Sequence, residues 1–425
     1  MLRILLEIGI LGLVASTGAT LLSLTALIRF LRQKPVVGQP FRVPNAPDTD
    51  AWAWRAASPR GPARPTAFYA PPVSLLKPLH GAEPNLETHL ETFFLQDYPN
   101  YEILFCARCP DDPGLATARR IAARHPNIPV RFLFTGDDTW INAKVSSLEV
   151  MAAYALHDIF IISDSDVRVT PDYLREVVAP FAVETTGAVT CLYRGVADRG
   201  LWSKLEAAGM SVEMTAGVLT ASLLEGMKFA LGPTMAVRRR CIRKMGGFGV
   251  LGPYCSDDFV LGARVAAQGS TVVLSRHVID HIVLNIGFLD SLQHQTRWMR
   301  STRFSRPLGH LGTALTFSVP WGILACCAAL ALHEPILGVS LLAYSILQRI
   351  ILAGLTGRLA VNEPHLLRTV VLYPLRDLLG FFCWLSSYAG NTILWRGRRY
   401  RLSRGGLMHP MLPATAEDSE GALTA

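Results

Sequence analysis

The 425-residue sequence predicts an α/β protein with a mostly parallel sheet, attached to a membrane by apolar helices at both ends. Three observations lead to this prediction. A long apolar segment lies near the N-terminus, short β-rich runs alternate with helical stretches from about residue 73 to 310, and further apolar blocks follow from residue 311. The composition agrees, because 50% of the residues are hydrophobic and only 17% are charged, which is more apolar than an ordinary soluble domain.

The N-terminal segment, residues 5–30, has one acidic residue near its start and then no charge until Arg29. About 20 apolar residues suffice to cross a bilayer, so we expect residues 1–34 to contain a transmembrane helix. A cleaved signal peptide is the alternative, since small residues occur between Ala15 and Ala19, but the apolar run continues for several turns beyond them. Residues 35–72 are rich in Pro, Ala and Arg and are expected to form an extended linker.

The region from residue 73 to 310 begins with four β-rich runs that helical stretches separate. The runs lie at 73–76, 101–107, 129–134 and 158–163. The clearest helices between them are expected at 86–94 and 114–125. Strands that alternate with helices indicate a parallel sheet, whose ligands bind beyond the carboxyl ends of the strands. Later strands are expected within 187–193, 228–237 and 271–275.

The fourth strand ends abruptly at Asp164, Ser165 and Asp166, on the expected ligand-binding edge. A turn that caps the following helix would also explain these residues, because Asp and Ser side chains bond to nearby backbone N–H groups. Their position favours the other interpretation, in which carboxylate oxygens hold a divalent cation against a phosphate. Asp164 and Asp166 are therefore candidate metal ligands.

A second acidic pair, Asp257 and Asp258, follows a glycine-rich stretch and opens a predicted helix. Acidic residues are favourable at any helix N-terminus, which is the simplest explanation. Beside a metal site, one of these carboxylates could instead serve as a general base. The next predicted helix carries arginines at every third position from Arg297 to Arg306, and the first of them is the best placed for a substrate phosphate.

Three apolar blocks occupy the C-terminal part, at 311–332, 336–355 and 370–395. The first two can form a hairpin of membrane spans. The third contains Arg376 and Asp377, and could span the membrane, re-enter it or lie at its interface. Basic residues follow both the N-terminal helix and the last block, which by the positive-inside rule places residues 73–310 in the cytoplasm. We expect membrane segments over residues 311–400 and a tail over 401–425.

The net charge of +8 is concentrated near the apolar segments and favours anionic lipid and phosphate as partners. No pattern of interleaved basic and aromatic residues indicates binding to nucleic acid. The eight cysteines are scattered, and Cys106 and Cys109 form a CxxC pair without a second pair at zinc-ligand spacing. We expect the cysteines to be small buried side chains without disulfides.

Five segments, taken in order and followed by membrane spans, carry a resemblance to a known family. They are VSLLKPLHGAEPNLETHLETFFLQDYP, WINAKVSSL, SDSDVRV, CSDDF and QTRW. The chain resembles the ceramide glucosyltransferase family of inverting glycosyltransferases, which have the GT-A fold and are related to the cellulose and hyaluronan synthases. The resemblance covers about residues 73–310. Within the family, LKPLHGAEP and VTCLYRG are most similar to the bacterial branch that adds N-acetylglucosamine to hopanoid polyols.

The resemblance implies roles for the acidic and basic residues. Asp164 matches the second aspartate of the family pattern, and Asp166 completes its metal motif. Asp258, with Asp257 beside it, matches the catalytic base. The last motif is matched by Arg297 and Trp298, and the polar positions that contact nucleotide in the family correspond to Lys77, Asn142 and Lys144.

The chain departs from the family pattern at two positions. Cys109 aligns with the first aspartate, which lies near the uracil, and Asp111 and Asp112 follow closely enough to replace it. His294 stands where the last motif has Gln or Arg. We therefore consider Asp111, Asp112 and His294 as candidate contacts of the nucleotide sugar.

The resemblance implies transfer of a sugar from a UDP-sugar donor to a hydroxyl of a membrane lipid, with inversion and with Mg²⁺ or Mn²⁺ as cofactor. Glucose with ceramide, or N-acetylglucosamine with a hopanoid polyol, is the expected pair. A processive polysaccharide synthase is the enzymatic alternative, and a membrane receptor or transporter that binds nucleotide without turnover is the alternative of another class. We expect an integral protein of a bacterial inner membrane, with its catalytic domain in the cytoplasm.

Overall fold

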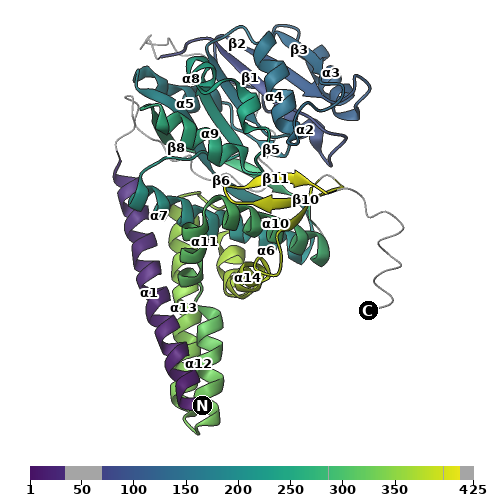
Figure 1. Cartoon of the computed structure of the whole chain (residues 1–425). Helices are drawn as coiled ribbons and strands as arrows, with labels where there is room; N and C mark the ends of the chain where they lie inside the picture. Colours follow the sequence, from purple (N-terminus) through teal and green to yellow (C-terminus); the bar gives the residue numbers. More distant parts are fainter. Residues whose placement is uncertain (34–68, 286, 396, 412–425) are drawn as a thin grey trace, which may run out of the picture.

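The computed structural model describes residues 1–33, 69–285, 287–395 and 397–411. An α/β domain occupies the upper half of the molecule, and a bundle of long helices projects from its underside (Figure 1). The expected linker, residues 35–72, lies almost wholly outside the described residues, and the expected tail, residues 401–425, lies partly outside them.

The α/β domain is built on an eight-stranded sheet with the strand order β3-β2-β1-β4-β7-β6-β8-β5. β1 pairs in parallel with β2 and with β4, and β2 pairs in parallel with β3, so the expected parallel half is confirmed. β7 runs antiparallel between β4 and β6. The strands are β1 (Val73–Pro78), β2 (Tyr101–Ala107), β3 (Val130–Phe134), β4 (Ile159–Ser163), β5 (Val167–Arg168), β6 (Thr186–Ala197), β7 (Thr234–Arg238) and β8 (Thr271–Val283).

The central strands β1, β2 and β4 are buried along their whole length, because helices cover both faces of the sheet. This is why they appear in the sequence as continuous apolar runs. The expected strand within 228–237 begins only at Thr234. Pro233 cannot donate a backbone hydrogen bond to the ladder, so the pairing with β4 starts after it.

Short helices connect the strands, and two of them, α3 and α4, begin with a side-chain cap. α3 starts where the side chain of Asp112 accepts from the N–H of Gly114, with Pro113 at the first helical position. α4 starts in the same way at Asn142. The helices of this domain are α2 (Leu86–Glu91), α3 (Pro113–Arg124), α4 (Ala143–Tyr154), α5 (Tyr173–Val178), α8 (Arg239–Met245) and α9 (Asp257–Ala267).

A second layer of helices lies beneath the sheet. α6 (Gly200–Gly209) continues through a π-helical segment, η2 (Met210–Met214), into α7 (Thr215–Glu225). α10 (Phe288–Ser305) contains the QTRW sequence and contacts α6 and α14. This layer therefore joins the sheet to the apolar helices.

The apolar helices are α1 (Leu2–Arg32), α11 (Pro307–Thr313), α12 (Val319–Ala331), α13 (Pro335–Leu359) and α14 (Leu366–Ser386). α12 and α13 pack as the expected hairpin, and α1 runs beside both of them (Figure 1). Within the described residues, α1, α13 and the segment Gly200–Glu225 are long and apolar enough to cross a membrane, and the pair Pro307–Thr316 and Val319–Ala331, bent by 48°, would make a fourth span if it counts as one.

Two features of this region were not expected from the sequence. The segment Gly200–Glu225 has an apolar window that is 56% buried inside the protein, because it packs on β6 and α14. α14, whose behaviour the sequence left open, lies across the end of the bundle and is seen nearly end-on while α1, α12 and α13 run lengthwise (Figure 1). α14 is not one of the described helices that are long and apolar enough to cross a membrane.

A small antiparallel sheet follows α14. It consists of β9 (Thr392–Trp395), β10 (Arg398–Ser403) and β11 (Leu407–Pro410). Its core contains four buried side chains, Ile393, Tyr400, Leu402 and Met408. The sequence analysis had left these residues to the last apolar block and the tail.

Candidate active site

The Asp164 turn lies at the carboxyl end of β4, and a lysine supports it from inside the domain. Lys77, at the end of β1, is 0% exposed. Its Nζ donates to the backbone oxygen of Asp164 at 2.5 Å and to Oγ of Ser163 at 3.4 Å, and lies 3.7 Å from the ring centroid of Phe93. Burial lowers the pKa of Lys77 to about 7. Lys77 therefore supports the turn from inside the domain, and its expected contact with the nucleotide stays a prediction.

Lys144 and Asn142 join the two acidic segments. Lys144 Nζ lies 2.6 Å from Oδ1 of Asp164 and 3.8 Å from Oδ2 of Asp257. Asn142 is fully buried, accepts from the backbone N–H of Lys144 at 3.1 Å and donates to Oδ1 of Asp257 at 3.2 Å. Lys144 thus faces the carboxylates, whereas Asn142 holds Asp257 and the start of α4 in place.

Asp258 lies beside Asp164 across Gly232. Its Oδ2 accepts from the N–H of Gly232 at 2.8 Å, and its Oδ1 accepts from the N–H of Phe259 at 2.7 Å. A Cβ atom placed on Gly232 would be 3.2 Å from Oδ2 of Asp258 and 3.9 Å from Oδ2 of Asp164. Burial, and then the neighbouring charge of Asp257, raise the pKa of Asp258 to about 6. A carboxylate with this pKa suits a general base near neutral pH.

The carboxylates at the turn fit a divalent cation. Oδ1 of Asp166 is buried without a hydrogen-bond partner, and its Oδ2 lies 3.6 Å from Nε2 of His281 on β8. The described residues contain no group of three or more His, Cys, Asp or Glu side chains that could hold a metal alone. A cation held by Asp164 and Asp166 would therefore need phosphate and water oxygens as well, which is how Mg²⁺ usually binds in nucleotide enzymes.

Glu83 is a third carboxyl group near the turn that the sequence analysis did not select. It follows β1, and burial, together with the charge of Asp166, raises its pKa to about 7. Its Oε2 is buried without a partner. Glu83 lies inside the LKPLHGAEP segment, but a single acidic residue in a loop gives no signal of its position.

Arg297 projects from α10 near the Asp258 segment. Its guanidinium carbon lies 6.0 Å from the ring centroid of Trp395 on β9, and it has no ion-pair partner among the described residues. Burial lowers the pKa of Arg297. One turn further along α10, Oγ of Ser301 lies 2.7 Å from Oγ of Ser256, directly before the acidic pair. These contacts place the guanidinium of Arg297 near the segment that leads to Asp257 and Asp258.

His294 and Trp298 are half-buried side chains of α10. Nδ1 of His294 lies 2.6 Å from Oε1 of Glu206 on α6, and its ring centroid lies 4.6 Å from that of Trp298. Trp298 in turn meets the ring of His281 edge-on at 6.5 Å. Since His281 lies beside Asp166, α10 approaches the Asp164 turn as well as the Asp258 segment.

The loop after β2 lies at the same edge of the sheet but plays a different part. Asp112 accepts from the N–H of Gly114 at 2.7 Å and from the N–H of Gly81 at 3.0 Å, so both of its oxygens are occupied by backbone groups. Cys109 and Asp111 are exposed. Of the two acids proposed to replace the first family aspartate, Asp111 has the free carboxylate.

The C-terminal sheet closes against the loop that leads to the acidic pair. The N–H of Met408 donates to the oxygen of Pro253 at 2.8 Å, and the N–H of Cys255 donates to the oxygen of Gly406 at 3.0 Å. Tyr254 forms a β-bridge with Leu407. These contacts are not predicted by any pattern in the sequence.

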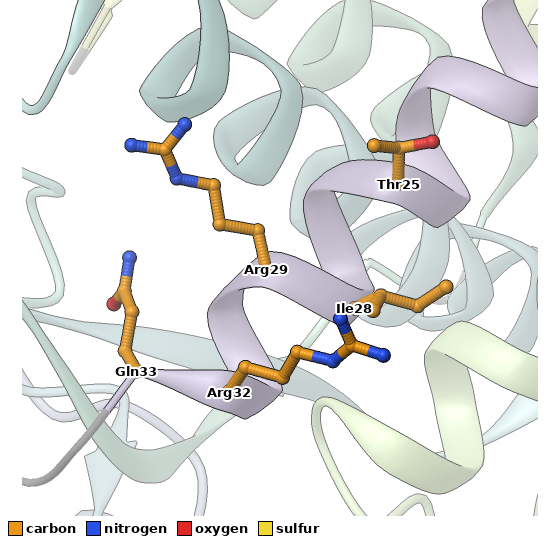
Figure 2. Close-up of a pocket in the computed structure, with 5 residues that line it drawn as sticks. All are labelled: Thr25, Ile28, Arg29, Arg32 and Gln33. Atoms are coloured by element: carbon orange, nitrogen blue, oxygen red, sulfur yellow. The ribbon is translucent and has the colours of Figure 1, made fainter.

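An open pocket of about 410 Å³ lies away from this site, at the end of α1 (Figure 2). Its lining includes Arg29 and Arg32, whose guanidinium groups extend to different sides of the helix. Among the described residues, no acidic side chain lines it. Two arginines at the end of an apolar helix suit lipid headgroup phosphates and do not suit catalysis.

Comparison with known proteins identifies the family of the chain. The model of the family described as "Glycosyl transferase family 21" matches residues 49–408. Ceramide glucosyltransferase 1 from Caenorhabditis elegans is 22% identical over 342 residues, which cover 79% of this chain and 72% of the relative. The ceramide glucosyltransferase from Komagataella phaffii is 34% identical over 101 residues, which cover 23% of this chain and 20% of the relative.

Among solved structures, a mannosyltransferase from Pyrobaculum calidifontis in complex with GDP-Man and Mn²⁺ is similar with a TM-score of 0.50. It is 19% identical, and the match covers 90% of this chain and 99% of that chain. This likeness confirms the GT-A fold. The family match spans most of the sequence, and the chain is therefore a glycosyltransferase that belongs to glycosyl transferase family 21.

Proposed function

We propose that the protein transfers one sugar from a UDP-sugar donor to a hydroxyl group of a membrane lipid, with inversion at the anomeric carbon. The observation that carries this proposal is the position of Asp258. Its carboxylate lies beside that of Asp164 across Gly232, so a proton acceptor and a metal ligand share one small region. Such a pair is what a direct displacement on a nucleotide sugar requires.

The proposed mechanism assigns a role to each side chain. Asp164 and Asp166 would hold Mg²⁺ or Mn²⁺, which acts as a Lewis acid on the leaving diphosphate. Arg297 adds a forked hydrogen-bond donor to the same anion. Asp258 accepts the proton of the attacking hydroxyl as the sugar passes through an oxocarbenium-like state. A single displacement inverts the anomeric centre.

A lipid acceptor is supported by the helices around the site. α11 follows α10 directly and leads into α12, and it exposes apolar side chains at Leu308 and Leu311, which are 84% and 58% exposed. Residues three apart on a helix lie on one face, so these side chains form an apolar edge beside the site. A lipid would reach Asp258 by lateral diffusion. The relatives named ceramide glucosyltransferases make glucose and ceramide the first pair to test.

The test is incubation of purified protein with UDP-glucose, UDP-N-acetylglucosamine and UDP-galactose, each with ceramide, diacylglycerol or a hopanoid polyol, followed by mass spectrometry. We expect one lipid to gain the mass of a single sugar while UDP is released. The Asp258→Asn variant is the control and should keep UDP-sugar binding but lose transfer by about 10²- to 10⁴-fold. Polymer chains, UDP release without a glycolipid, or full activity of the variant would contradict the proposal.

A further inference from the structure

Glu206 is a buried carboxylate that the proposed mechanism does not use. It lies on α6, is 2% exposed, and accepts four hydrogen bonds. Nδ1 of His294 lies 2.6 Å from Oε1, Oγ of Ser291 donates to Oε2 at 2.6 Å, and Nδ2 of Asn285 lies 3.1 and 3.2 Å from the two oxygens. A buried carboxylate is costly unless it is paired. All of these donors come from the beginning of α10 and the loop before it.

These contacts fix the ring of His294. A carboxylate only accepts hydrogen bonds, so Nδ1 of His294 carries the hydrogen that faces Glu206. The ring also contacts that of Trp298, with 4.6 Å between the centroids and a tilt of 53°. Because the contacts with Glu206 and Trp298 fix the orientation of the imidazole ring, they also fix the direction in which Nε2 points.

Nε2 is the nitrogen of His294 that remains available to a ligand. It has no hydrogen-bond partner among the described residues, and the side chain is 25% exposed. His294 and Arg297 are three residues apart and share one face of α10. Trp298, which packs on His294, also meets His281 beside Asp166. Nε2 of His294 and the guanidinium of Arg297 thus belong to the face of α10 that approaches the Asp164 turn.

We propose that Glu206 is a positioning residue that acts through His294, fixing the imidazole so that Nε2 contacts the diphosphate of the donor beside Arg297. An imidazole between two anions carries both protons, one directed at each. The diphosphate would then be held by two cations on one helix face, and Glu206 offsets the repulsion between them. This inference rests on the proposed function only in requiring a nucleoside diphosphate at the site.

A purely structural role is the competing explanation, in which Glu206 does no more than attach α6 to α10. The two explanations differ in what a substitution changes. Loss of a positioning residue weakens binding of the diphosphate and leaves the nucleoside unaffected. Loss of a structural tie disturbs the whole site and lowers the affinity for both.

The test compares UDP with uridine by calorimetry, using the full-length protein with Mn²⁺. In Glu206→Gln and in His294→Asn, we expect UDP affinity to fall about tenfold and uridine affinity to stay unchanged. The amide nitrogen of asparagine can take the place of Nδ1 toward Glu206, whereas nothing replaces Nε2, so folding is preserved. The double variant should also lose about tenfold, because both changes remove the same contact. Ser291→Ala is the matched control, since it removes another donor to Glu206, and should change UDP affinity by less than about twofold.

Equal losses for UDP and uridine, multiplied losses in the double variant, or wild-type UDP affinity in Glu206→Gln would overturn the positioning role. If the wild type transfers sugar while Glu206→Gln binds UDP normally, the inference fails and the proposed function stands. If the wild type does not bind UDP at all, both fail.

Discussion

The raised pKa of Asp258 predicts how the rate of sugar transfer changes with pH. Because its pKa is raised to about 6, the group is protonated, and unable to accept the hydroxyl proton, below that pH. We expect the rate of transfer to be level above about pH 6 and to fall about tenfold for each pH unit below it. Initial rates between pH 4.5 and 8 with saturating donor measure this. A rate that rises as the pH falls would contradict the role of Asp258 as the base.

The unpartnered Oδ1 of Asp166 predicts that the site depends on a divalent cation. We expect EDTA to stop transfer and Mg²⁺ or Mn²⁺ to restore it. Asp166→Asn should raise the metal concentration needed for half-maximal rate, because an amide oxygen is a weaker ligand for hard cations than a carboxylate. The titration uses metal-free protein, with Asp158→Asn as the control, because the Asp158 side chain is 94% exposed and lies outside the site. Full activity after thorough chelation would contradict this prediction.

For single residues, the sequence indicated those whose position after a strand or at the start of a helix can be recognised from neighbouring residues. Asp164, Asp166 and Asp258 follow strands or open a helix, and their spacing matches a family pattern. Glu206 could not be found in this way, since it lies on an apolar helix and its partner His294 is 88 positions away. The sequence indicated Lys77 as a nucleotide contact. Its burial beneath the turn cannot be determined from one sequence.

The C-terminal sheet is the element whose contribution is easiest to test. Trp395 lies against Arg297, whereas its neighbour Leu394 is 51% exposed. Cation–π contacts contribute about 0.5–2 kcal/mol, so Trp395→Ala should lower kcat/KM about 2- to 30-fold. Trp395→Phe should restore part of the loss, and Leu394→Ala should match the wild type. Equal effects of both alanine variants would show that the sheet does not position Arg297.

This sheet was missed for a physical reason. Its strands carry many basic side chains and follow an apolar helix, so the residues resemble the charged flank of a membrane span. One signal was present in Gly405 and Gly406, which connect β10 and β11 with φ angles of 83° and 80°. Two adjacent glycines between alternating residues are typical of a tight hairpin turn. The strands of the main sheet were predictable because burial on both faces demands uninterrupted apolar residues.

The whole molecule has its α/β domain on one side of the helix bundle (Figure 1). Basic residues at the end of α1, Arg29 and Arg32, favour the cytoplasmic side for that domain. Cys109 is exposed on the domain and provides a probe of this topology. We expect a membrane-impermeant maleimide to label it in inverted inner-membrane vesicles and to leave it unlabelled in intact spheroplasts. Cys109→Ser controls for labelling of the other cysteines, and labelling in spheroplasts would contradict the proposed orientation.

At the scale of the whole chain, the sequence predicted that catalytic segments far apart would meet at one sheet edge. The edge itself follows from the strand and helix alternation. The way in which the segments contact one another does not follow from the sequence, because it depends on contacts such as that of Lys144 with both acidic segments. The crosswise position of α14 likewise depends on packing against neighbouring helices, which a hydropathy pattern does not contain.

The most direct test of the account is a cryo-electron microscopy structure of the protein in lipid nanodiscs with Mn²⁺ and UDP. We predict metal density at Asp164 and Asp166, a diphosphate between it and Arg297, and an open path from Asp258 to the headgroup layer. UDP bound elsewhere, or a diphosphate site that faces away from the bilayer, would contradict the central claim that one diphosphate unites these segments beside the membrane.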